Sequence, residues 1–433
     1  MTPVTSGLLG FMVLVILMFV RIPVGFVMTI VGFLGFGLLV SWNASLNLLA
    51  RDFFSVFGSY NLTVIPLFVL MGQVAHYTGL SGRLFNTANK FLGHLPGGLA
   101  IATIGACAGF SAICGSTTAT AATMASVALP EMKKYRYDPS LATGVVAAGG
   151  SLGILIPPST IFIIYGIMTE QSVGKLFMAG ILPGILLTIF FILTIVAWTR
   201  LQPGLCVPAP KASLRERIAS LSGVIETFLL FVIVMGGLFV GFFTPTEAAG
   251  IGACGTLVIA LIGGHLTWQG FARSLNETTR ISCMILVIVA GATVFGHFLA
   301  VTTIPAGIGL WVAGLKWPPF LIIGLIILIY LLLGCLMDSL AMIMLTIPVF
   351  YPVVTTLGYD PIWFGVVIVL IAEMGVITPP VGINVYVVAG VARDVPLQVI
   401  FRGASHMIIA LFLTAILLII FPQIALFLPG LMK

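Results

Sequence analysis

The stretch that decides the fold is Gly-Gly-Ser-Leu-Gly-Ile-Leu-Ile-Pro-Pro-Ser at residues 149–159. A partner, Gly-Val-Ile-Thr-Pro-Pro-Val-Gly, stands at 375–382, and both contain Gly-x-x-x-Pro-Pro inside a long apolar run. The offset between them is constant, because 375 − 153 and 379 − 157 both give 222. The tripeptide Tyr-Asp-Pro at 137–139 recurs at 359–361 with that same offset. Two matched motifs with unchanged spacing indicate an internal duplication.

The Pro-Pro pairs are expected to interrupt helices, because proline lacks an N–H and clashes with the preceding turn. Each backbone carbonyl freed in this way costs several kcal/mol in lipid unless it faces a cavity or holds a cation. Paired interrupted helices in the two halves of a transporter point to a substrate and ion site near the bilayer midplane. The alternative is a simple proline kink packed against neighbouring helices.

The composition predicts an all-α polytopic membrane protein. Of the 433 residues, 60% are hydrophobic and only 7% are charged, so a soluble surface could not be hydrated. The 49 glycines and 24 prolines suit close helix packing and broken helices. We expect one membrane domain and no soluble domain. The formal net charge of +6 is interpreted as a signal of membrane orientation and not of nucleic-acid binding.

Apolar runs predict five membrane spans in each half of the chain. In the first half we expect spans at 4–20, 24–41 and 58–78, a broken helix at 139–168 and a span at 181–199. In the second half we expect spans at 223–243, 248–266 and 281–300, a broken helix at 361–392 and a last span at 403–428. The expected connections are a polar segment at 41–52, an amphipathic interfacial segment at 81–93, an amphipathic connector at 169–180 and a polar loop at 200–217.

Two further runs, 95–130 and 318–350, are interpreted as re-entrant hairpins. Their centres, at 109–118 and 334–339, are rich in small and polar residues. At about 1.5 Å per residue, neither arm of 95–130 crosses the roughly 30 Å core of a bilayer. The alternative for 95–130 is a single kinked span, which would invert the orientation of everything downstream.

Five crossings per half is an odd number, so the two repeats are expected to be inverted relative to each other. With both hairpins re-entrant, 14 of the 18 Lys and Arg fall on one side of the membrane, Arg21 among them. The other side keeps Arg51, Lys175, Lys316 and Lys433. The positive-inside rule then makes the inter-repeat loop cytoplasmic and both termini periplasmic. The first hairpin enters from the cytoplasm and the second from the opposite side.

Each hairpin centre is expected to meet the break in the helix that follows it. The first meeting point is predicted to bind sodium through Ser111, Ala112, Gly153, Ile156 and Pro157. The second is predicted to bind sodium through Gly334, Gly375, Thr378 and Val381. These groups offer backbone carbonyls and hydroxyls, which are hard neutral oxygens and suit Na⁺ better than softer metals.

The hairpin centres also hold the predicted substrate-binding residues, which are Ser116, Thr117, Thr118, Asp338 and Ser339. No hairpin centre has Lys or Arg, so a carboxylated substrate would need backbone N–H groups, hydroxyls and bound cations. Helix capping is an alternative role for the Ser-Thr-Thr run, and it is compatible with binding.

Asp338 and Glu373 are the acids placed deep in apolar runs, where a carboxylate is costly and is a functional candidate by default. We assign Asp338 to the substrate or cation cavity, and its alternative role is the N-cap of the second hairpin arm. For Glu373, a functional role and a contact with a neighbouring helix both stay open. His76 and His297 are interpreted as packed side chains and not as proton relays.

Four motifs make the chain resemble a known family. They are Gly-Ser-Thr-Thr-Ala-Thr at 115–120, Leu-Pro-Glu-Met at 129–132, Gly-Ile-Leu-Ile-Pro-Pro-Ser at 153–159 and Thr-Pro-Pro at 378–380. Over essentially the whole chain, the sequence resembles the DctM-type large membrane subunit of tripartite ATP-independent periplasmic (TRAP) transporters, in the ion transporter superfamily. That family often has a second serine where Thr117 stands, and the hydroxyl is kept.

The resemblance implies an elevator-type fold, in which a transport domain moves along a scaffold. Scaffold helices and arms would occupy 1–94 and 218–317, and the transport domain would occupy 95–180 and 318–402. A span with the inter-repeat loop at 181–217 and a C-terminal span at 403–433 complete the chain. The family's sodium sites lie where a hairpin tip meets a broken helix. This matches Ser111, Gly153 and Pro157 in one half and Gly334, Gly375 and Thr378 in the other.

The resemblance also implies sodium-driven uptake of an organic acid, a carboxylate or sugar acid, across a bacterial inner membrane. It implies two protein partners: a small four-helix membrane subunit, expected as a separate chain, and a periplasmic substrate-binding protein. Na⁺ is the expected coupling ion, no other cofactor is expected, and membrane lipid surrounds the protein.

A second hypothesis is a stand-alone sodium-coupled dicarboxylate carrier that needs no binding protein. An intramembrane enzyme would need a nucleophile–base pair or a metal cluster at membrane depth. The sequence has no His-x-x-x-His, no Asp-rich pair and no Cys-x-x-Cys, so we expect no enzyme. A pore is disfavoured, because inverted repeats around broken helices suit alternating access.

Overall fold

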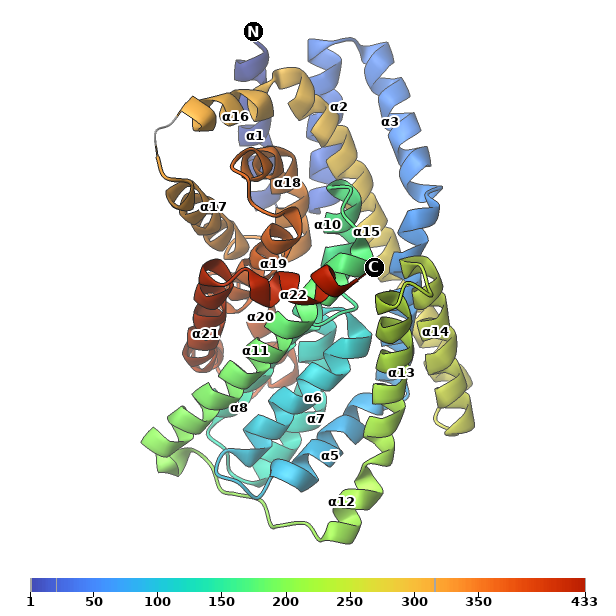
Figure 1. The fold of residues 1–433 in the computed structure, drawn as a ribbon, viewed down its shortest axis with the longest axis vertical. Coiled ribbons are helices and arrows are strands. Elements are labelled where there is room, and N and C mark those ends of the chain that lie inside the picture. The colour runs from blue at the N-terminus through green and yellow to red at the C-terminus, as the bar shows by residue number, and fades with distance from the viewer. Residues whose placement is uncertain (1, 21, 315–316, 433) are drawn as a thin grey trace.

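The described part of the chain is helical and contains no β-strand (Figure 1). The computed structural model describes residues 2–20, 22–314 and 317–432. Seven described helical segments are long and apolar enough to cross a membrane, if Pro139–Met168 and Leu214–Phe239 are each counted as one. An eighth candidate is the pair Trp42–Phe57 and Tyr60–Tyr77, which is bent by 50°. The chain is therefore a multi-pass membrane protein, as its composition predicts.

The helices form two sets, one before and one after the polar stretch near residue 210. The first half forms α1 (Pro3–Phe19), α2 (Val24–Leu39), α3 (Trp42–Phe57), the 3₁₀ helix η1 (Tyr60–Thr63), α4 (Val64–Tyr77), α5 (Leu80–Leu92), α6 (Gly98–Cys114), α7 (Thr117–Lys134), α8 (Pro139–Gly150), α9 (Leu152–Leu155), α10 (Thr160–Met168) and α11 (Val173–Leu201). After the 3₁₀ helix η2 (Pro203–Leu205), the second half forms α12 (Leu214–Ser220), α13 (Ser222–Phe239), α14 (Pro245–Ile262), α15 (Trp268–Thr302), α16 (Ile304–Gly314), α17 (Pro319–Gly334), α18 (Ser339–Thr356), α19 (Pro361–Ile377), α20 (Ile383–Val391), α21 (Leu397–Ile420) and α22 (Gln423–Leu431).

A first group of helices is built around α15. Helix α2 lies along α15, and α4 packs against both α14 and α15. Glycines allow the backbones to approach: a Cβ at Gly32 would lie 2.7 Å from the backbone nitrogen of Phe295. A Cβ at Gly291 would overlap the carbonyl oxygen of Gly25. Small residues are the usual means of tight packing between membrane helices, because lipid is as apolar as the side chains.

A second group of helices mixes elements from the two halves of the chain. Helix α8 packs against α7 and α21, and α19 packs against α17 and α21. Helix α20 of the second half lies on α7 and α8 of the first, while α10 of the first half lies on α18 and α19. In Figure 1, α10 in green accordingly lies beside α18 and α19 in orange. Both Pro-Pro segments therefore belong to one packed body.

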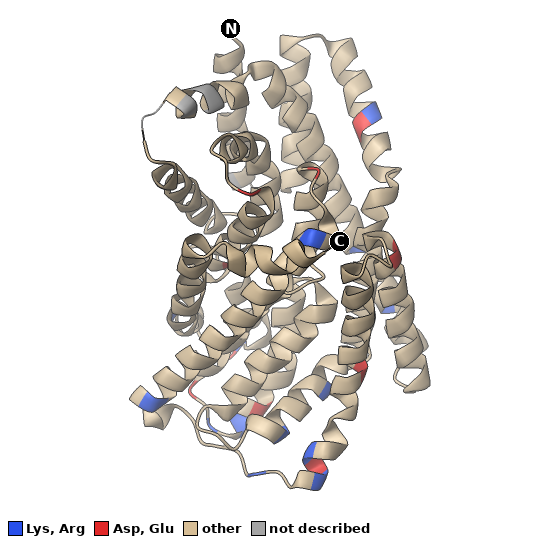
Figure 2. Ribbon diagram, in the orientation of Figure 1, with Lys and Arg blue, Asp and Glu red and all other residues tan. Residues whose placement is uncertain are grey.

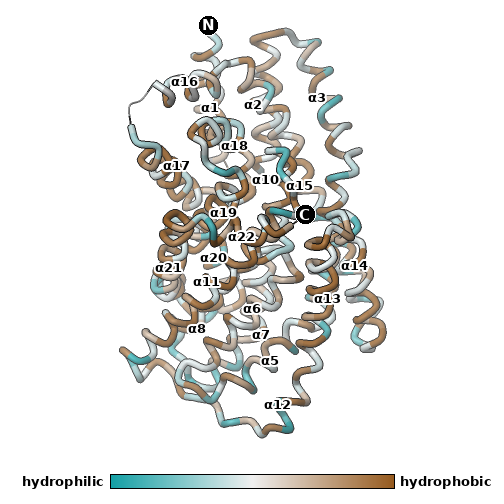
Figure 3. Tube along the Cα trace, in the orientation of Figure 1, coloured by the Kyte–Doolittle hydropathy of each residue, from teal (hydrophilic) through white to brown (hydrophobic). Residues whose placement is uncertain are grey.

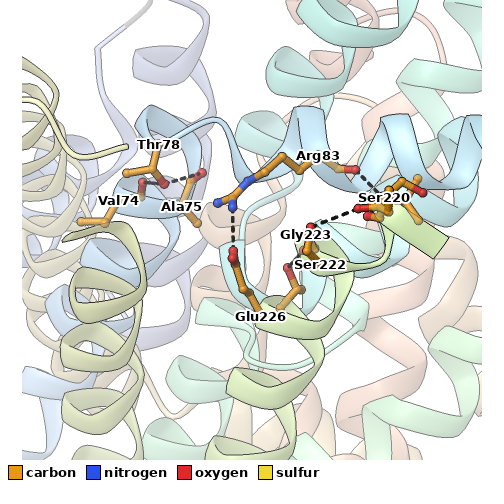
Figure 4. Close-up of polar contacts among 11 residues, drawn as sticks. Val74, Ala75, Thr78, Arg83, Ser220, Ser222, Gly223 and Glu226 are labelled. Carbon is orange, nitrogen blue, oxygen red and sulfur yellow. Dashed lines mark hydrogen bonds and ion pairs between the residues drawn. The ribbon is translucent and has the colours of Figure 1, made fainter. Parts of the chain in front are cut away.

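The amphipathic segment expected at 81–93 is α5, and one of its faces is attached to α12 and α13 (Figure 4). The Arg83 guanidinium donates to Glu226 Oε2 at 2.7 Å. One turn further on, Thr87 Oγ1 donates to the carbonyl oxygen of Ser220 at 2.6 Å. Residues four apart lie on the same side of a helix, so these contacts define one continuous interface. Gly223 on α13 keeps that interface close, because a Cβ there would lie 2.7 Å from Arg83 Cβ.

Charge and hydropathy vary along the long axis of the molecule. Lys and Arg are most frequent at the end formed by α12, the end of α11 and the neighbouring loops (Figure 2). The tube between the two ends is dominated by hydrophobic colour (Figure 3). Large apolar side chains such as Phe228, Ile262 and Leu328 are exposed. This pattern suits a lipid-facing surface. The side of the membrane that each end faces stays a prediction, and Arg21, Lys316 and Lys433 lie outside the described residues.

The prediction of a polar connection at 41–52 is wrong, because these residues form the N-cap and most of α3. Ser41 caps the helix, and its Oγ accepts from the backbone N–H of Ala44 at 3.2 Å. The polar residues Ser45 and Asp52 are seven positions apart and both are buried, so they share one helix face. Ser45 Oγ donates to the carbonyl oxygen of Phe33 at 2.6 Å. The Ser45 hydroxyl is thus hydrogen-bonded inside the protein and not to water in a loop.

Two helices run further than their apolar stretches predict. Helix α15 begins at Trp268 and not near 281, since Thr267 Oγ1 caps it by accepting from Gly270 N at 3.0 Å. Its polar first turns are used for packing: Ser274 Oγ lies 3.4 Å from the carbonyl oxygen of Gln73 on α4. Helix α11 joins the connector expected at 169–180 to the span expected at 181–199, and it continues through Pro183.

Two expected segments at the ends of the halves are divided differently by the structure. The last span, expected at 403–428, consists of α21 and α22, with Pro422 at the break between them. The loop expected at 200–217 is partly helical, since α11 ends at Leu201 and α12 begins at Leu214. Ser213 caps α12 in a reciprocal arrangement with Glu216, which explains a helix start inside the polar stretch.

Candidate functional site

Both Pro-Pro pairs stand in gaps between helices. Helix α9 ends at Leu155 and α10 begins at Thr160, so 156–159 form the first gap. Helix α19 ends at Ile377 and α20 begins at Ile383, so 378–382 form the second gap. The Pro157–Pro158 and Pro379–Pro380 bonds are both cis. The helix ends on either side leave backbone carbonyl and N–H groups without intrahelical partners.

The first hairpin tip, between α6 and α7, lies against the first gap. Gly115 has a φ of 63°, a left-handed conformation that favours glycine. A Cβ at Gly115 would lie 2.6 Å from the carbonyl oxygen of Pro158, and one at Gly153 would overlap that of Ser116. Thr160 Oγ1 donates to the carbonyl oxygen of Gly115 at 3.2 Å. The glycines are thus required by the close approach of tip and gap.

The second hairpin tip, between α17 and α18, lies against the second gap in the same way. A Cβ at Gly375 would overlap the backbone carbonyl group of Gly334. The backbone N–H of Val381 donates to the carbonyl oxygen of Cys335 at 3.3 Å. Gly375 follows Gly153 by the 222-residue offset, and each glycine lies against the backbone of the hairpin in its own half, Gly153 at Ser116 and Gly375 at Gly334.

The predicted residues of the first sodium site lie on neighbouring elements. Ser111 and Ala112 are in the last turn of α6, which packs against the short helix α9 that carries Gly153. Ile156 and Pro157 follow directly in the gap. The Ser111 side chain is fully buried, and its Oγ has no hydrogen-bond partner among the described residues. A buried hydroxyl without a partner costs about 1–3 kcal/mol, so this oxygen fits a cation ligand. The binding of sodium here stays a prediction.

The predicted residues of the second sodium site surround one junction. Gly334 and Gly375 touch, and Val381 bonds the residue that follows Gly334. The backbone N–H of Thr378, the C-cap of α19, donates to the carbonyl oxygen of Gly375 at 3.1 Å. These contacts bring the four residues together around backbone oxygens, the ligand type that Na⁺ accepts. Their role as ligands also stays a prediction.

All five predicted substrate-binding residues line one cavity of about 140 Å³. Ser116, Thr117 and Thr118 contribute one wall from the first hairpin tip, and Asp338 and Ser339 contribute another from the second tip. Helices α4 and α15 close the opposite side with Val69, Gln73, Ile281, Met284 and Ile285. The cavity therefore lies between the two groups of helices. It is smaller than the roughly 300–1,000 Å³ of sites for drug-sized ligands, which suits a small solute.

Two helix N-termini open at this cavity. Ser116 is the N-cap of α7, and its Oγ accepts from Ala119 N at 3.4 Å. Asp338 is the N-cap of α18, and its Oδ2 accepts from Leu340 N at 3.1 Å. The capping alternative for both residues is therefore present together with their place in the cavity wall. Helix N-termini favour anionic groups, through unpaired N–H groups and the helix dipole.

Larger cavities lie away from the hairpin tips. One of about 460 Å³ lies between α7, α8 and the turn at 391–395. At its rim Lys133 forms an ion pair with Asp394, and the hydrogen bond from Lys133 lowers the pKa of that carboxyl. Another of about 580 Å³ lies between η1, α10 and α14. Neither touches both tips, so we place the candidate site at the smaller cavity.

Two polar residues at the site were not among the predicted ligands. Gln73, on α4, lines the cavity from the side opposite the tips. Asn384, in the first turn of α20, is fully buried and donates to Thr117 Oγ1 at 2.8 Å. The signal for both was a carboxamide inside an apolar run, and Asn384 also lies four residues after Pro380 of the second Pro-Pro pair.

The two histidines of the apolar runs each have a polar neighbour. His76 Nδ1 on α4 lies 2.7 Å from Thr123 Oγ1 on α7. His297 Nε2 on α15 lies 3.3 Å from the carboxylate of Asp52 on α3. The first contact joins the two groups of helices, and the second lies within the group around α15.

A multi-pass helical protein in which two hairpin tips pack onto two interrupted helices has the construction of a secondary transporter. The family profile described as "Tripartite ATP-independent periplasmic transporter, DctM component" matches residues 11–424. The chain belongs to this family of TRAP transporter large permeases.

Curated relatives are similar over most of their length. The chain is 37% identical over 388 residues to the C4-dicarboxylate TRAP transporter large permease protein DctM of Pseudomonas aeruginosa, which covers 89% of this chain and 90% of that one. It is 34% identical to the sialic acid TRAP transporter large permease protein SiaM of Vibrio cholerae, covering 96% of each. It is 30% identical to the ectoine/5-hydroxyectoine TRAP transporter large permease protein UehC of Ruegeria pomeroyi, covering 97% and 98%. All three are named as transport permeases and not as enzymes.

Solved structures share the fold at low sequence identity. The YdaH transporter of Alcanivorax borkumensis superimposes with a TM-score of 0.59 at 15% identity, covering 89% of this chain and 90% of that one. MtrF of Neisseria gonorrhoeae superimposes with a TM-score of 0.57 at 14% identity, covering 86% and 83%. At these identities the likeness concerns the fold alone.

Proposed function

We propose that this chain is the large permease subunit of a sodium-coupled TRAP transporter that imports an organic acid. The observation that carries the proposal is the cavity between the hairpin tips and α4 and α15. Two helix N-termini open there, and no Lys, Arg or His is among the residues that line it. The names of the relatives, which refer to C4-dicarboxylates, sialic acid and ectoine, support a substrate that carries a carboxylate.

Coupling to sodium follows from the charge balance of the cavity. Asp338 lines it, and a carboxylated substrate would bring a second negative charge. Two like charges 4 Å apart repel by about 4 kcal/mol near a protein surface, or roughly a thousandfold in affinity. Cations held at the two tip–gap junctions would offset this repulsion. In this scheme the hydroxyls of Ser116, Thr118 and Ser339 and the N-terminal N–H groups orient the anion, and substrate binds only with sodium.

Movement of an elevator type accounts for the position of the cavity. One wall is formed by the hairpin tips and the other by α4 and α15. If the tips and interrupted helices move as one body along α4 and α15, the same cavity opens first to one side of the membrane and then to the other. The two inverted repeats would supply the matching inward and outward arrangements.

The partners and location follow from the family and the charge pattern. We propose that the chain works in a bacterial inner membrane with a small four-helix membrane subunit and a periplasmic substrate-binding protein. The end that carries α12 would face the cytoplasm, because basic residues gather there (Figure 2).

The test is transport by the purified chain together with its small subunit in proteoliposomes. We expect uptake of the cognate organic acid only when an inward sodium gradient and the binding protein are both present. Uptake without the binding protein would support a stand-alone sodium-coupled dicarboxylate carrier instead. Uptake with a proton gradient alone, in choline buffer, would overturn the sodium coupling.

A further inference from the structure

A buried carboxylate lies at the centre of the body that carries both hairpin tips. The Glu373 side chain, in the last turns of α19, is fully buried. Its Oε2 accepts a hydrogen bond from Thr117 Oγ1 at 3.1 Å, but Oε1 has no partner in the part of the chain that the structure describes. No ion pair joins Glu373 to any described basic residue.

A second orphan oxygen lies next to this carboxylate. The Asn384 side chain is fully buried, and its Nδ2 donates both to Thr117 Oγ1 at 2.8 Å and to the carbonyl oxygen of Ala147 at 3.1 Å. The carbonyl can only accept, which fixes the orientation of the carboxamide. Oδ1 is then left without a hydrogen-bond partner among the described residues. One hydroxyl group, that of Thr117, thus joins two side chains that each keep a free acceptor.

Four elements converge on these side chains. Thr117 is the first residue of α7, Ala147 belongs to α8, and Glu373 and Asn384 flank the second gap from α19 and α20. The packing leaves no room for a larger neighbour: a Cβ at Gly150 would lie 2.9 Å from Asn384 Nδ2. Thr117, Glu373 and Asn384 belong to the same group of helices that forms the tip–gap junctions. They are not among the residues of the two predicted sodium sites.

The two unpaired oxygens, Glu373 Oε1 and Asn384 Oδ1, can both accept, so a positively charged group would satisfy them. An unpaired carboxylate in a low-dielectric interior is so costly that it must be neutralised or paired. Among the described residues, no three His, Cys, Asp or Glu side chains lie together as metal ligands, so a transition-metal site does not fit. One carboxylate, one carboxamide and one hydroxyl are hard oxygens with a single negative charge, which suits a monovalent alkali cation.

We propose that Glu373 Oε1, Asn384 Oδ1 and Thr117 hold a sodium ion at a third site, in addition to the two tip–gap junctions. The proposal rests on the proposed sodium coupling. The ion would neutralise Glu373 inside the moving body. It would also act on the substrate cavity, because Thr117 lies between Ser116 and Thr118 on the cavity wall. Loss of this ion would therefore lower substrate affinity without removing a group that lines the cavity.

The experiment is equilibrium binding of ²²Na⁺ to the purified permease with its small subunit. We expect Glu373→Gln and Asn384→Ala each to lose one bound sodium ion per protein relative to wild type. The sodium Hill coefficient of uptake should fall by about one in both variants. Glu373→Asp, which keeps the charge, should retain the ion with weaker affinity. Ser151→Ala is the matched control: Ser151 precedes Glu373 by 222 residues, is equally buried, and its Oγ donates to the carbonyl oxygen of Ala148 on α8, the helix that Ser151 caps, at 2.6 Å.

The outcomes separate this site from the coupling itself. If Glu373→Gln and Asn384→Ala are folded, by size-exclusion profile and thermal unfolding in choline buffer, and bind as many sodium ions as wild type, the third site does not exist and the carboxyl is neutral instead. If only Asn384→Ala folds, its sodium count decides in the same way. If wild type binds no sodium while it still transports, the proposed sodium coupling fails together with this site.

Discussion

Gly375 sets the closest approach between the second hairpin tip and α19. A Cβ there would overlap the backbone carbonyl of Gly334, and backbone cannot move aside as a side-chain end can. We expect Gly375→Ala to push the tip away and to weaken sodium binding about 10- to 100-fold. This range corresponds to the roughly 1–3 kcal/mol of an overpacked contact. The measurement is the sodium concentration that gives half-maximal uptake.

The matched control for Gly375→Ala is Gly324→Ala in α17 of the same hairpin. A Cβ at Gly324 has nothing within 4 Å, so the substitution adds a methyl group without a contact. It should leave the sodium dependence unchanged. Equal sodium dependence in the two variants would show that the tip–gap contact does not form the second sodium site.

Asp338 has two roles that substitutions can separate. It caps α18 through Leu340 N, and it lines the cavity with its charge. Asp338→Asn keeps an oxygen for the cap, whereas Asp338→Ala also removes the cap, at about 1 kcal/mol. We expect both variants to lose at least nine-tenths of sodium-driven uptake. Only Asp338→Ala should lower the thermal unfolding temperature.

Asp360 provides the control for the charge of Asp338. It caps α19 through Ile362 N at 2.8 Å and Trp363 N at 3.0 Å, but it is not among the residues that line the cavity. Asp360→Asn should therefore transport like wild type. Normal uptake by Asp338→Asn would remove Asp338 from the mechanism and leave it as a cap alone.

Sequence reasoning reached the glycines and hydroxyls of the tips but not the side chains that join the tips to other helices. The 222-residue offset pointed to Gly153 and Gly375, because a repeated backbone break leaves a repeated motif. Asn384 has no such marker, since 384 − 222 is 162, where the sequence has Phe162. Its bond to Thr117 depends on how α20 packs on α7, which is a long-range contact that no local pattern encodes.

At the scale of whole elements, α5 is held against α13 by close contact as much as by charge. A Cβ at Gly223 would lie 2.7 Å from Arg83 Cβ, close to the α5 backbone. Replacing a helical glycine by alanine gains up to about 1 kcal/mol from helix propensity. We expect Gly223→Ala to lose this gain and to destabilise the protein by about 1–2 kcal/mol, because α5 must shift. Thermal unfolding in detergent measures the difference.

Gly236, also on α13, is the reference for that substitution. A Cβ there would have only Val232 Cγ1 near it, at 4.0 Å, which is ordinary contact. Gly236→Ala should be neutral or slightly stabilising, so the difference between the two variants isolates the α5–α13 contact. A Gly223→Ala variant as stable as Gly236→Ala would mean that α5 is not fixed to α13. In that case the Arg83–Glu226 ion pair, whose side chains are about one-third exposed, would not fix α5 to α13 either.

Composition failed to predict helices in segments whose polar residues are partly buried against other helices. Apolar runs located most spans, but α3 and the first turns of α15 are polar, and hydropathy assigns polar segments to loops. In α3 the buried polar residues Ser45 and Asp52 share one face, where Ser45 bonds to α2 and Asp52 lies beside His297 of α15. A helical period of polar residues, rather than their number, was the signal that these segments are helices.

For the molecule as a whole, the two halves differ at positions that the 222-residue offset relates. The cavity acid Asp338 corresponds by the 222-residue offset to Ser116, and the buried acid Glu373 corresponds to Ser151. Both of these carboxylates therefore belong to the second half, while the first half has hydroxyls at the corresponding positions. An anion that bound between two equal halves would meet equal surroundings. In the proposed sodium-coupled mechanism, the second half would need cations before it could share the substrate, which would give the two junctions different tasks.

The elevator movement itself can be tested at the contact between His76 on α4 and Thr123 on α7, whose side chains meet at 2.7 Å. Cysteines at both positions, His76→Cys with Thr123→Cys, would lie on opposite sides of the proposed sliding boundary. In a background without the six native cysteines, a short bifunctional thiol reagent should join them. We expect uptake to be lost after cross-linking and to return when a reducible linker is cleaved, because α7 carries the tip residues that must move.

The control pair is Asp52→Cys with His297→Cys, which lie 3.3 Å apart on α3 and α15 within the group of helices built around α15. Cross-linking this pair joins two elements on the same side of the boundary, so it should leave uptake at its rate before the reagent. Each variant is compared with itself before and after linkage, which removes the effect of the substitutions. Mass spectrometry would show whether the cysteines of His76→Cys and Thr123→Cys are joined. If the joined protein keeps full uptake, sliding of α7 along α4 is ruled out. Transport would then have to occur by movements of the hairpin tips alone.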